Sequence, residues 1–299
     1  RSRNPKAGKA GLRAVVGSRK NALDHLDTAF ENGFNLFSTG CQILIADGLK
    51  GTDDVLVPVD GDYIKQAKIG RAVMDADIII SLTHFKGHES TGFGGAIKNL
   101  GMGCGSRAGK MEMHSSGKPQ VDQGRCVGCG ECRRNCAHDA ITIENHKAFI
   151  DHNKCVGCGR CIGACPKDAT HPTGDNTNEV LNCKMAEYAL AVVNRRPQFH
   201  VCLVQDVSPC CDCHGCNDTP ILPDIGMFTS FDAVAIDQAC ADACLAATPI
   251  TKNTRLEEMT HLGEDPFINS HPISEWRSQL IHGEKIGLGQ RDYELIVMK

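Results

Sequence analysis

Runs of apolar residues separated by amphipathic stretches organise the first third of the chain. The periodicity predicts a helix over 18–33, with Ser18 as its N-cap, and a buried strand over 42–46. A helix over 63–76 and a second buried strand over 77–83 follow. Short, continuous apolar runs of this kind are typical of strands that are buried on both faces.

The same alternation returns in the second half of the chain. It predicts a helix over 179–194, a strand over 200–205 and a helix over 232–247. Nearer the C-terminus we expect a packing helix around Trp276 and a final strand over 293–298. Together these elements predict an α/β fold in which a mostly parallel sheet has helices on both faces.

A segment of different composition interrupts this pattern. It is rich in Cys and Gly and holds one motif twice, as CVGCGEC at 126–132 and CVGCGRC at 155–161. Apolar residues at 141–143 and 149–150 predict a small hairpin between the two copies. We therefore expect an inserted α+β module. The predicted organisation is an irregular N-terminal segment, the first part of the α/β domain, the insert and the second part of the α/β domain: 1–17, 18–119, 120–171 and 172–299.

The cysteines of the insert have the spacing of a bacterial two-cluster ferredoxin. The pattern C-x2-C-x2-C-x3-C occurs twice, and Pro166 follows the second copy. In such ferredoxins the fourth Cys of each copy ligates the other cluster. We therefore expect two [4Fe-4S] clusters, the first held by Cys126, Cys129, Cys132 and Cys165 and the second by Cys136, Cys155, Cys158 and Cys161.

Zinc and disulfides are the alternatives for these thiols. Zinc ribbons carry paired C-x2-C knuckles with a longer gap between the pairs, which disfavours zinc here. The glycines at 128, 130, 157 and 159 suit a cluster, because tight turns around one need backbone conformations that are open to Gly.

Composition and charge narrow the function classes. The 299 residues include 18 Cys but only 1 Trp and 3 Tyr, an excess of sulfur that indicates metal or redox chemistry. A net charge of -4 disfavours nucleic acid and anionic membranes as partners, and no apolar stretch approaches the ~20 residues of a membrane-spanning helix. We expect a cytoplasmic protein with reduced thiols. The first 20 residues hold seven basic groups and no acid, which suits a transit-like leader or a chain whose natural start is missing.

Loops that follow strands carry the next candidate sites, because ligands of open parallel sheets bind beyond the carboxyl ends of strands. The glycine-rich loop 84–110 offers backbone amides and cations to a phosphate or carboxylate. His84 and His88, with His114 beyond them, suit proton transfer or metal ligation. A surface loop that packs on the insert is the alternative. The cations of the predicted anion cradle are Lys86, Lys98, Arg107 and Lys110.

A second loop, after the strand over 200–205, holds four thiols and His214 within seven residues. Its thiols are Cys210, Cys211, Cys213 and Cys216. Zinc, a third iron–sulfur cluster and a redox-active thiol pair are all chemically permitted there, and free thiols are the alternative.

Several of these motifs together resemble the iron–sulfur proteins of domain-of-unknown-function family 362. They are THFKGH at 83–88, GFGGAIKN at 92–99, GMGCGSR at 101–107, the double ferredoxin motif, PDIG at 223–226 and AIDQ at 235–238. The resemblance runs from Ser18 to the C-terminus. It implies an α/β domain interrupted by a two-cluster ferredoxin, and it implies no particular reaction. Its members usually begin with a longer α/β segment and carry Cys-Asp-Cys near position 210, so Cys210 and Cys216 are additional thiols here.

Three hypotheses follow for the function. The first is electron transfer to a redox partner protein through the two clusters. The second is an oxidoreductase, in which the clusters serve a small anionic ligand bound at the loops 84–110 and 210–216 while His84 or His88 moves protons. The size of the α/β part favours ligand binding there. The third is a regulatory or assembly module with structural clusters.

Overall fold

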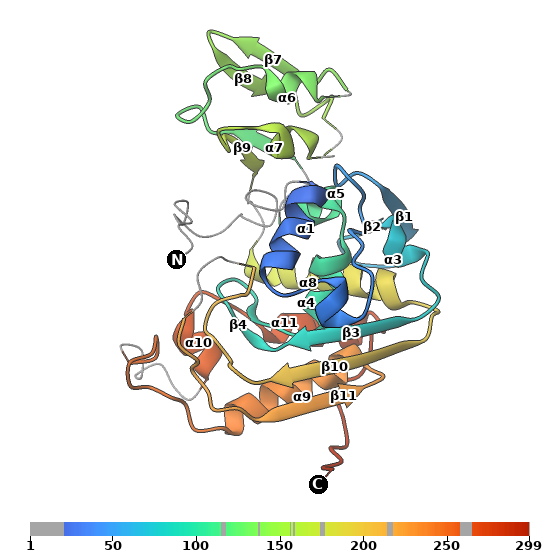
Figure 1. Ribbon diagram of the computed structural model, residues 1–299, viewed down its shortest axis with the longest axis vertical. Coiled ribbons are helices and arrows are strands. Elements are labelled where there is room, and N and C mark those ends of the chain that lie inside the picture. Colours follow the sequence, from blue (N-terminus) through green and yellow to red (C-terminus); the bar gives the residue numbers. More distant parts are fainter. Residues whose placement is uncertain are drawn as a thin grey trace.

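The computed structural model describes residues 21–114, 118–136, 138–155, 157, 159–173, 177–213, 218–257 and 265–298. It has an α/β body, and the segment with the repeated cysteine motif lies at one end of it (Figure 1). The helices are α1 (Ala22–Glu31), α2 (Leu36–Thr39), α3 (Arg71–Met74), α4 (Ala96–Cys104), α5 (Arg107–His114), α6 (Glu131–Arg134), α7 (Arg160–Ala164), α8 (Asn178–Val193), α9 (Ala233–Ala246), α10 (Pro266–Ser270) and α11 (Arg277–Lys285). The strands are β1 (Asp54–Pro58), β2 (Gln66–Gly70), β3 (Ile79–His84), β4 (Lys86–His88), β5 (Gly92–Gly94), β6 (Pro119–Val121), β7 (Ile141–Glu144), β8 (Lys147–Ile150), β9 (Thr170–Pro172), β10 (Gln198–Val204) and β11 (Gly226–Ser230).

The central sheet has the order β11-β10-β3. Strands β10 and β3 are parallel, with Leu203 opposite His84, whereas β10 and β11 are antiparallel. Helices α4 and α9 pack on this sheet, and α8 packs against α4. The other strands form four two-stranded antiparallel sheets, β1-β2, β4-β5, β6-β9 and β7-β8. The fold is therefore mixed α/β, but the sheet is smaller and less parallel than the sequence predicts.

The two faces of the central sheet differ in burial. On β3, Ser81 and Thr83 are buried, whereas Ile80 and Leu82 are 63% and 73% exposed. Met227 on β11 is 65% exposed. Over the residues that the structure describes, helices therefore cover one face of this sheet and not both.

The long core helices begin where the sequence provides caps. Thr177 accepts a hydrogen bond from the N–H of Val180 at the start of α8, and Asp232 accepts two from the first turn of α9. The helices expected over 179–194 and 232–247 and the strand expected over 200–205 are confirmed within one or two residues. The helix over 18–33, the strand over 77–83 and the hairpin of β7 and β8 are confirmed over their described residues as well.

Three predicted elements are wrong. Residues 42–46 form no strand, and Leu44 is 77% exposed, because this apolar run lies outside the sheet and pairs with no other strand. Residues 63–76 hold β2 and the short helix α3 in place of one helix. Gly70, at the junction of the two, weakens a helix and lies against the backbone of Ala46. Residues 293–298 form no strand and are exposed.

A buried carboxylate joins α8 to α11 and to the loop before β2. Glu187 is fully buried and accepts hydrogen bonds from the N–H groups of Asp62 at 2.7 Å and Ile64 at 2.6 Å. Its Oε1 lies 2.8 Å from Nε2 of His282. Hydrogen bonds with the side chains of Cys183 and Glu187 raise the pKa of His282 from 6.5 to about 9. This network ties elements distant in sequence to one charged group.

Candidate functional site

Two groups of thiols dominate the candidate chemistry of the chain. The first lies in the segment 119–172, whose ends are held together by the antiparallel pair of β6 and β9. Within this segment, the β7-β8 hairpin packs against the short helix α6, and α6 contacts α7 (Figure 1). Each of these two helices begins within one copy of the cysteine motif. The repeat in the sequence therefore corresponds to a repeat in local structure.

One small cavity in this segment is lined by four cysteines. They are Cys126, Cys129, Cys132 and Cys165, the set that the sequence predicts for the first cluster. Backbone amides point at two of these sulfurs, since the N–H of Ala148 lies 3.3 Å from Sγ of Cys126 and that of Ala169 lies 3.2 Å from Sγ of Cys165. Ile143 and Ala148 are among the other residues that line this cavity.

A second small cavity is lined by Cys136, Cys155 and Cys161. These are three of the four cysteines that the sequence predicts for the second cluster, and the fourth, Cys158, lies outside the described residues. Ile141 and Ile150 contribute apolar side chains to this cavity, which His138 and Arg160 also line. No disulfide joins any of the cysteines whose positions the structure describes.

Glycines shape the turns around both cavities. Gly128 and Gly130 have φ values of 64° and 78°, and the equivalent Gly157 and Gly159 have values of 73° and 68°. A side chain is strained in this left-handed region. The expectation that these four positions need the conformational freedom of Gly is confirmed.

The second group of thiols lies where β3 and β10 end. Because the two strands are parallel neighbours, the loops that follow them meet at one edge of the sheet. His84 lies at the end of β3, and its Nδ1 is 2.8 Å from Oδ2 of Asp212. This hydrogen bond raises the pKa of His84 above 6.5, although burial opposes the shift. The amine of Lys86 lies 3.6 Å from the same carboxylate.

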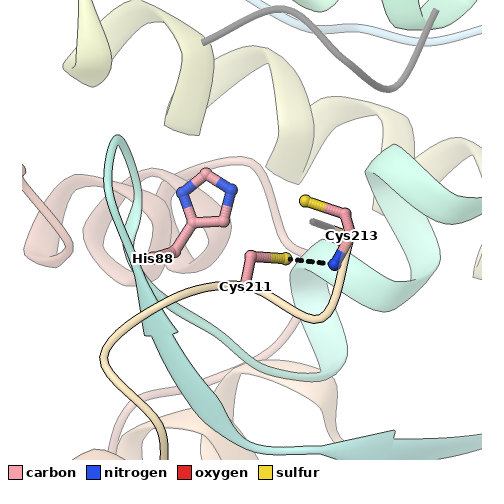
Figure 2. Close-up of side chains that lie close together, drawn as sticks. All are labelled: His88, Cys211 and Cys213. Carbon is pink, nitrogen blue, oxygen red and sulfur yellow. Dashed lines mark hydrogen bonds between the residues drawn. The ribbon is translucent and has the colours of Figure 1, made fainter. Parts of the chain in front are cut away.

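The side chains of His88, Cys211 and Cys213 lie close together, as Figure 2 shows. One potential ligand atom from each lies within 4.8 Å of the others, so the three could hold a metal ion. His88 and Cys211 are buried, with 6% and 3% exposure. Nδ1 of His88 accepts the N–H groups of Ser90 and Thr91, at 3.0 and 3.1 Å, so a neutral ring carries its proton on Nε2.

The charge in this cluster rests on Cys211. Its sulfur accepts the N–H of Cys213 at 3.4 Å and the amine of Lys98 at 3.3 Å. The pKa of Cys211 is lowered, first by a hydrogen bond between its side chain and the thiol of Cys213 and then by Lys98 and His88, whereas the pKa of Cys213 is raised by this thiol–thiol hydrogen bond and by burial. The pair is therefore a thiolate beside a thiol, stabilised by a cation.

Lys98 reaches this cluster from the first turn of α4. Gly95 precedes the helix and has no side chain with which to cap it. The cap comes from α9, where the buried carboxylate of Asp237 accepts the N–H groups of Ala96 at 2.6 Å and Ile97 at 2.9 Å. A Cβ on Gly95 would lie 2.2 Å from Oδ1 of Asp237, so only Gly leaves room for this contact.

The other predicted cations lie elsewhere. Lys110 donates to the carbonyl of Gly105, and Arg107 lies against Gly159 and Gly163 of the cysteine segment. The four cations of the predicted cradle therefore divide between separate places. Lys86 and Lys98 alone face the thiol loop.

The structure also places the remaining candidates. Burial beside the charges of Lys98 and His88 lowers the pKa of His114 to about 4. Cys210 is half-buried in the thiol loop, and His214 and Cys216 lie outside the described residues. Asp212 was not among the candidates from the sequence. Its position between two cysteines, in a loop that follows a strand, is the feature of the sequence that could have indicated it as a site residue.

The fold and the two thiol groups define a cysteine-rich α/β protein with candidate metal sites. The chain belongs to the family described as Domain of unknown function (DUF362), whose model matches residues 5–242. This match confirms the resemblance inferred from the motifs. A comparison with curated proteins finds no match. No helix among the described residues is long and apolar enough to cross a membrane.

Proposed function

We propose that the protein binds two [4Fe-4S] clusters in the segment 120–171, a ferredoxin-like insert, and transfers electrons through them to a redox partner protein. The observation that carries the proposal is the division of the segment's cysteines between two cavities. That division matches the two ligand sets predicted from the spacing, including the exchange of the fourth Cys.

The residues present fit such clusters. The first cavity offers four sulfurs and the second offers three, and Cys158, the fourth ligand predicted for the second cluster, lies outside the described residues. The amides of Ala148 and Ala169 donate to sulfur, which stabilises negative charge at the ligands. Ile141 lines the second cavity and Ile143 lines the first, so each cavity has an apolar side chain beside its sulfurs. When bound, each cluster supplies a one-electron redox centre.

A potentiometric titration followed by EPR tests the transfer of electrons. We expect two reduction steps within the range of about −700 to +450 mV that iron–sulfur clusters span. Clusters that resist reduction across this range would be structural, which would refute the proposal and favour a regulatory or assembly role.

A second candidate function is an oxidoreductase whose ligand binds where β3 and β10 end. The contact of Lys98 with the thiolate of Cys211, beside His88, favours it. In this role Lys86 and Lys98 would attract an anion, and His84, paired with Asp212, would hold a proton. The metal centre that this loop would bind is zinc or a third iron–sulfur cluster.

A thermal-shift screen with phosphates and carboxylates tests this candidate. Compounds that stabilise the wild-type chain should lose their effect in Lys86→Ala and Lys98→Ala, whereas Lys110→Ala, which removes a cation bonded to the carbonyl of Gly105, should respond as the wild type does. Equal responses from all four proteins would refute a ligand site at the thiol loop.

A further inference from the structure

The sulfur of Cys211 is surrounded by hydrogen-bond donors where β3 and β10 end. The amine of Lys98 donates to this sulfur at 3.3 Å, and the N–H of Cys213 donates to it at 3.4 Å. The side chains of His88 and Cys213 also form hydrogen bonds with it. Cys211 is only 3% exposed, so these contacts lie in a largely dry environment. Together they stabilise the ionised form of this thiol.

The tautomer of His88 distinguishes a free thiolate from a metal ligand at this position. Its Nδ1 accepts the N–H groups of Ser90 and Thr91, so the neutral ring has its proton on Nε2 and can donate it to Cys211. A metal ion would need the lone pair of Nε2, and both backbone amides would then lose their acceptor. The hydrogen bonds therefore favour a free thiolate over a metal ligand.

A second thiol lies beside this thiolate. The sulfurs of Cys211 and Cys213 lie within 4.8 Å of each other, on one short stretch of loop (Figure 2). Both are free cysteines, and Cys213 is half-buried, so the pair is less enclosed on its side. A thiolate next to a protonated thiol is the arrangement of a nucleophilic and a resolving cysteine in thiol–disulfide exchange.

We propose that Cys211 and Cys213 form a redox-active pair that exchanges with small disulfides. The thiolate of Cys211 attacks one sulfur of the disulfide, whose S–S bond breaks, and one half leaves as a thiolate. The thiol of Cys213 then gives up its proton and attacks the sulfur of Cys211, which releases the other half. The pair is thereby oxidised to a disulfide, and the small disulfide is reduced to two thiols. This exchange supplies chemistry for the second candidate function at the same loop, and it requires neither of the two clusters.

The donors around Cys211 also set the direction of the equilibrium. A charged donor such as Lys98 stabilises the thiolate of the reduced pair more than the uncharged sulfur of a disulfide. A pair whose reduced form is stabilised in this way is a stronger oxidant. Loss of the amine of Lys98 should therefore make the pair easier to oxidise.

Equilibration with mixtures of reduced and oxidised glutathione (GSH and GSSG), without oxygen, tests the proposal. Alkylation and mass spectrometry then locate the disulfides. We expect a disulfide between Cys211 and Cys213 whose fraction depends on [GSH]²/[GSSG]. Lys98→Met removes one charged hydrogen bond from the thiolate, so the value of this ratio at half-oxidation should rise about tenfold. Cys210→Ser removes the adjacent thiol and should titrate as the wild type does. In Cys213→Ser we expect a glutathione adduct on Cys211.

Four results would overturn the proposal. They are a pair that stays reduced in every mixture, a disulfide to Cys210 in place of the pair, a ratio that does not rise in Lys98→Met, and zinc bound by the two sulfurs. Iron content, measured on the same samples, separates this proposal from the proposed function. Exchange at the pair in a chain that holds no iron would support the redox-active pair and refute the clusters.

Discussion

The carboxylate of Asp237 connects the stability of the fold to the position of Lys98. Replacing Asp237 by Ala leaves the N–H groups of Ala96 and Ile97 buried and without their acceptor. Each such group costs about 1–3 kcal/mol. Burial raises the pKa of Asp237 to about 7 in spite of the two amide bonds, so relief of this buried charge offsets part of the loss. We expect Asp237→Ala to lower the free energy of unfolding by about 2–4 kcal/mol.

Urea unfolding at pH 8, followed by far-UV circular dichroism, measures this loss. Asp242→Ala is the matched control, because Asp242 lies on the same helix but accepts hydrogen bonds near the surface, from Gln238 and Tyr293. We expect it to cost less than about 1 kcal/mol. A loss below about 0.5 kcal/mol in Asp237→Ala would refute the capping role of this carboxylate.

Three further predictions address the thiols and the buried histidine. Cys126→Ser should remove about four irons per chain in a colorimetric iron assay, whereas the exposed Cys41→Ser should remove none. Lys98→Met removes the amine that lies 3.3 Å from Sγ of Cys211 and stabilises its thiolate. Iodoacetamide should therefore alkylate Cys211 more slowly at pH 7, as mapped by mass spectrometry. An unchanged rate would contradict the contact. Because the pKa of His282 is raised to about 9, its contribution to stability is complete below pH 6.5 and is lost as the pH rises through about 9. Urea midpoints from pH 6 to 10 should show this loss in the wild type but not in His282→Gln.

Local patterns in the sequence were enough to predict the elements whose structure is decided locally. Helices α8 and α9 have capping side chains and long apolar runs, and the cysteine motif specifies its own turns through its glycines. The run at 42–46 has the same apolar character as a buried strand. Whether such a run joins a sheet depends on pairing with distant residues, which a local pattern does not contain.

The thiol loop illustrates the same limit at the level of the site. His88 and Cys211 are far apart in sequence and meet because β3 pairs in parallel with β10. The rule that ligands bind beyond strand ends pointed to both loops but not to their contact. The sequence places Arg107 and Lys110 in the same glycine-rich stretch as Lys98. It does not reveal that both belong to helix α5 and make their contacts elsewhere, so the predicted anion cradle does not form as one group.

The content of iron, acid-labile sulfide and zinc in anaerobically purified protein tests the central claim most directly. Two [4Fe-4S] clusters require about eight irons and eight sulfides per chain, with two interacting EPR signals after reduction by dithionite. One further zinc, or about four further irons, would place a metal at the thiol loop as well. A chain that holds zinc at the cysteines of the segment 120–171 and no acid-labile sulfide would contradict the account.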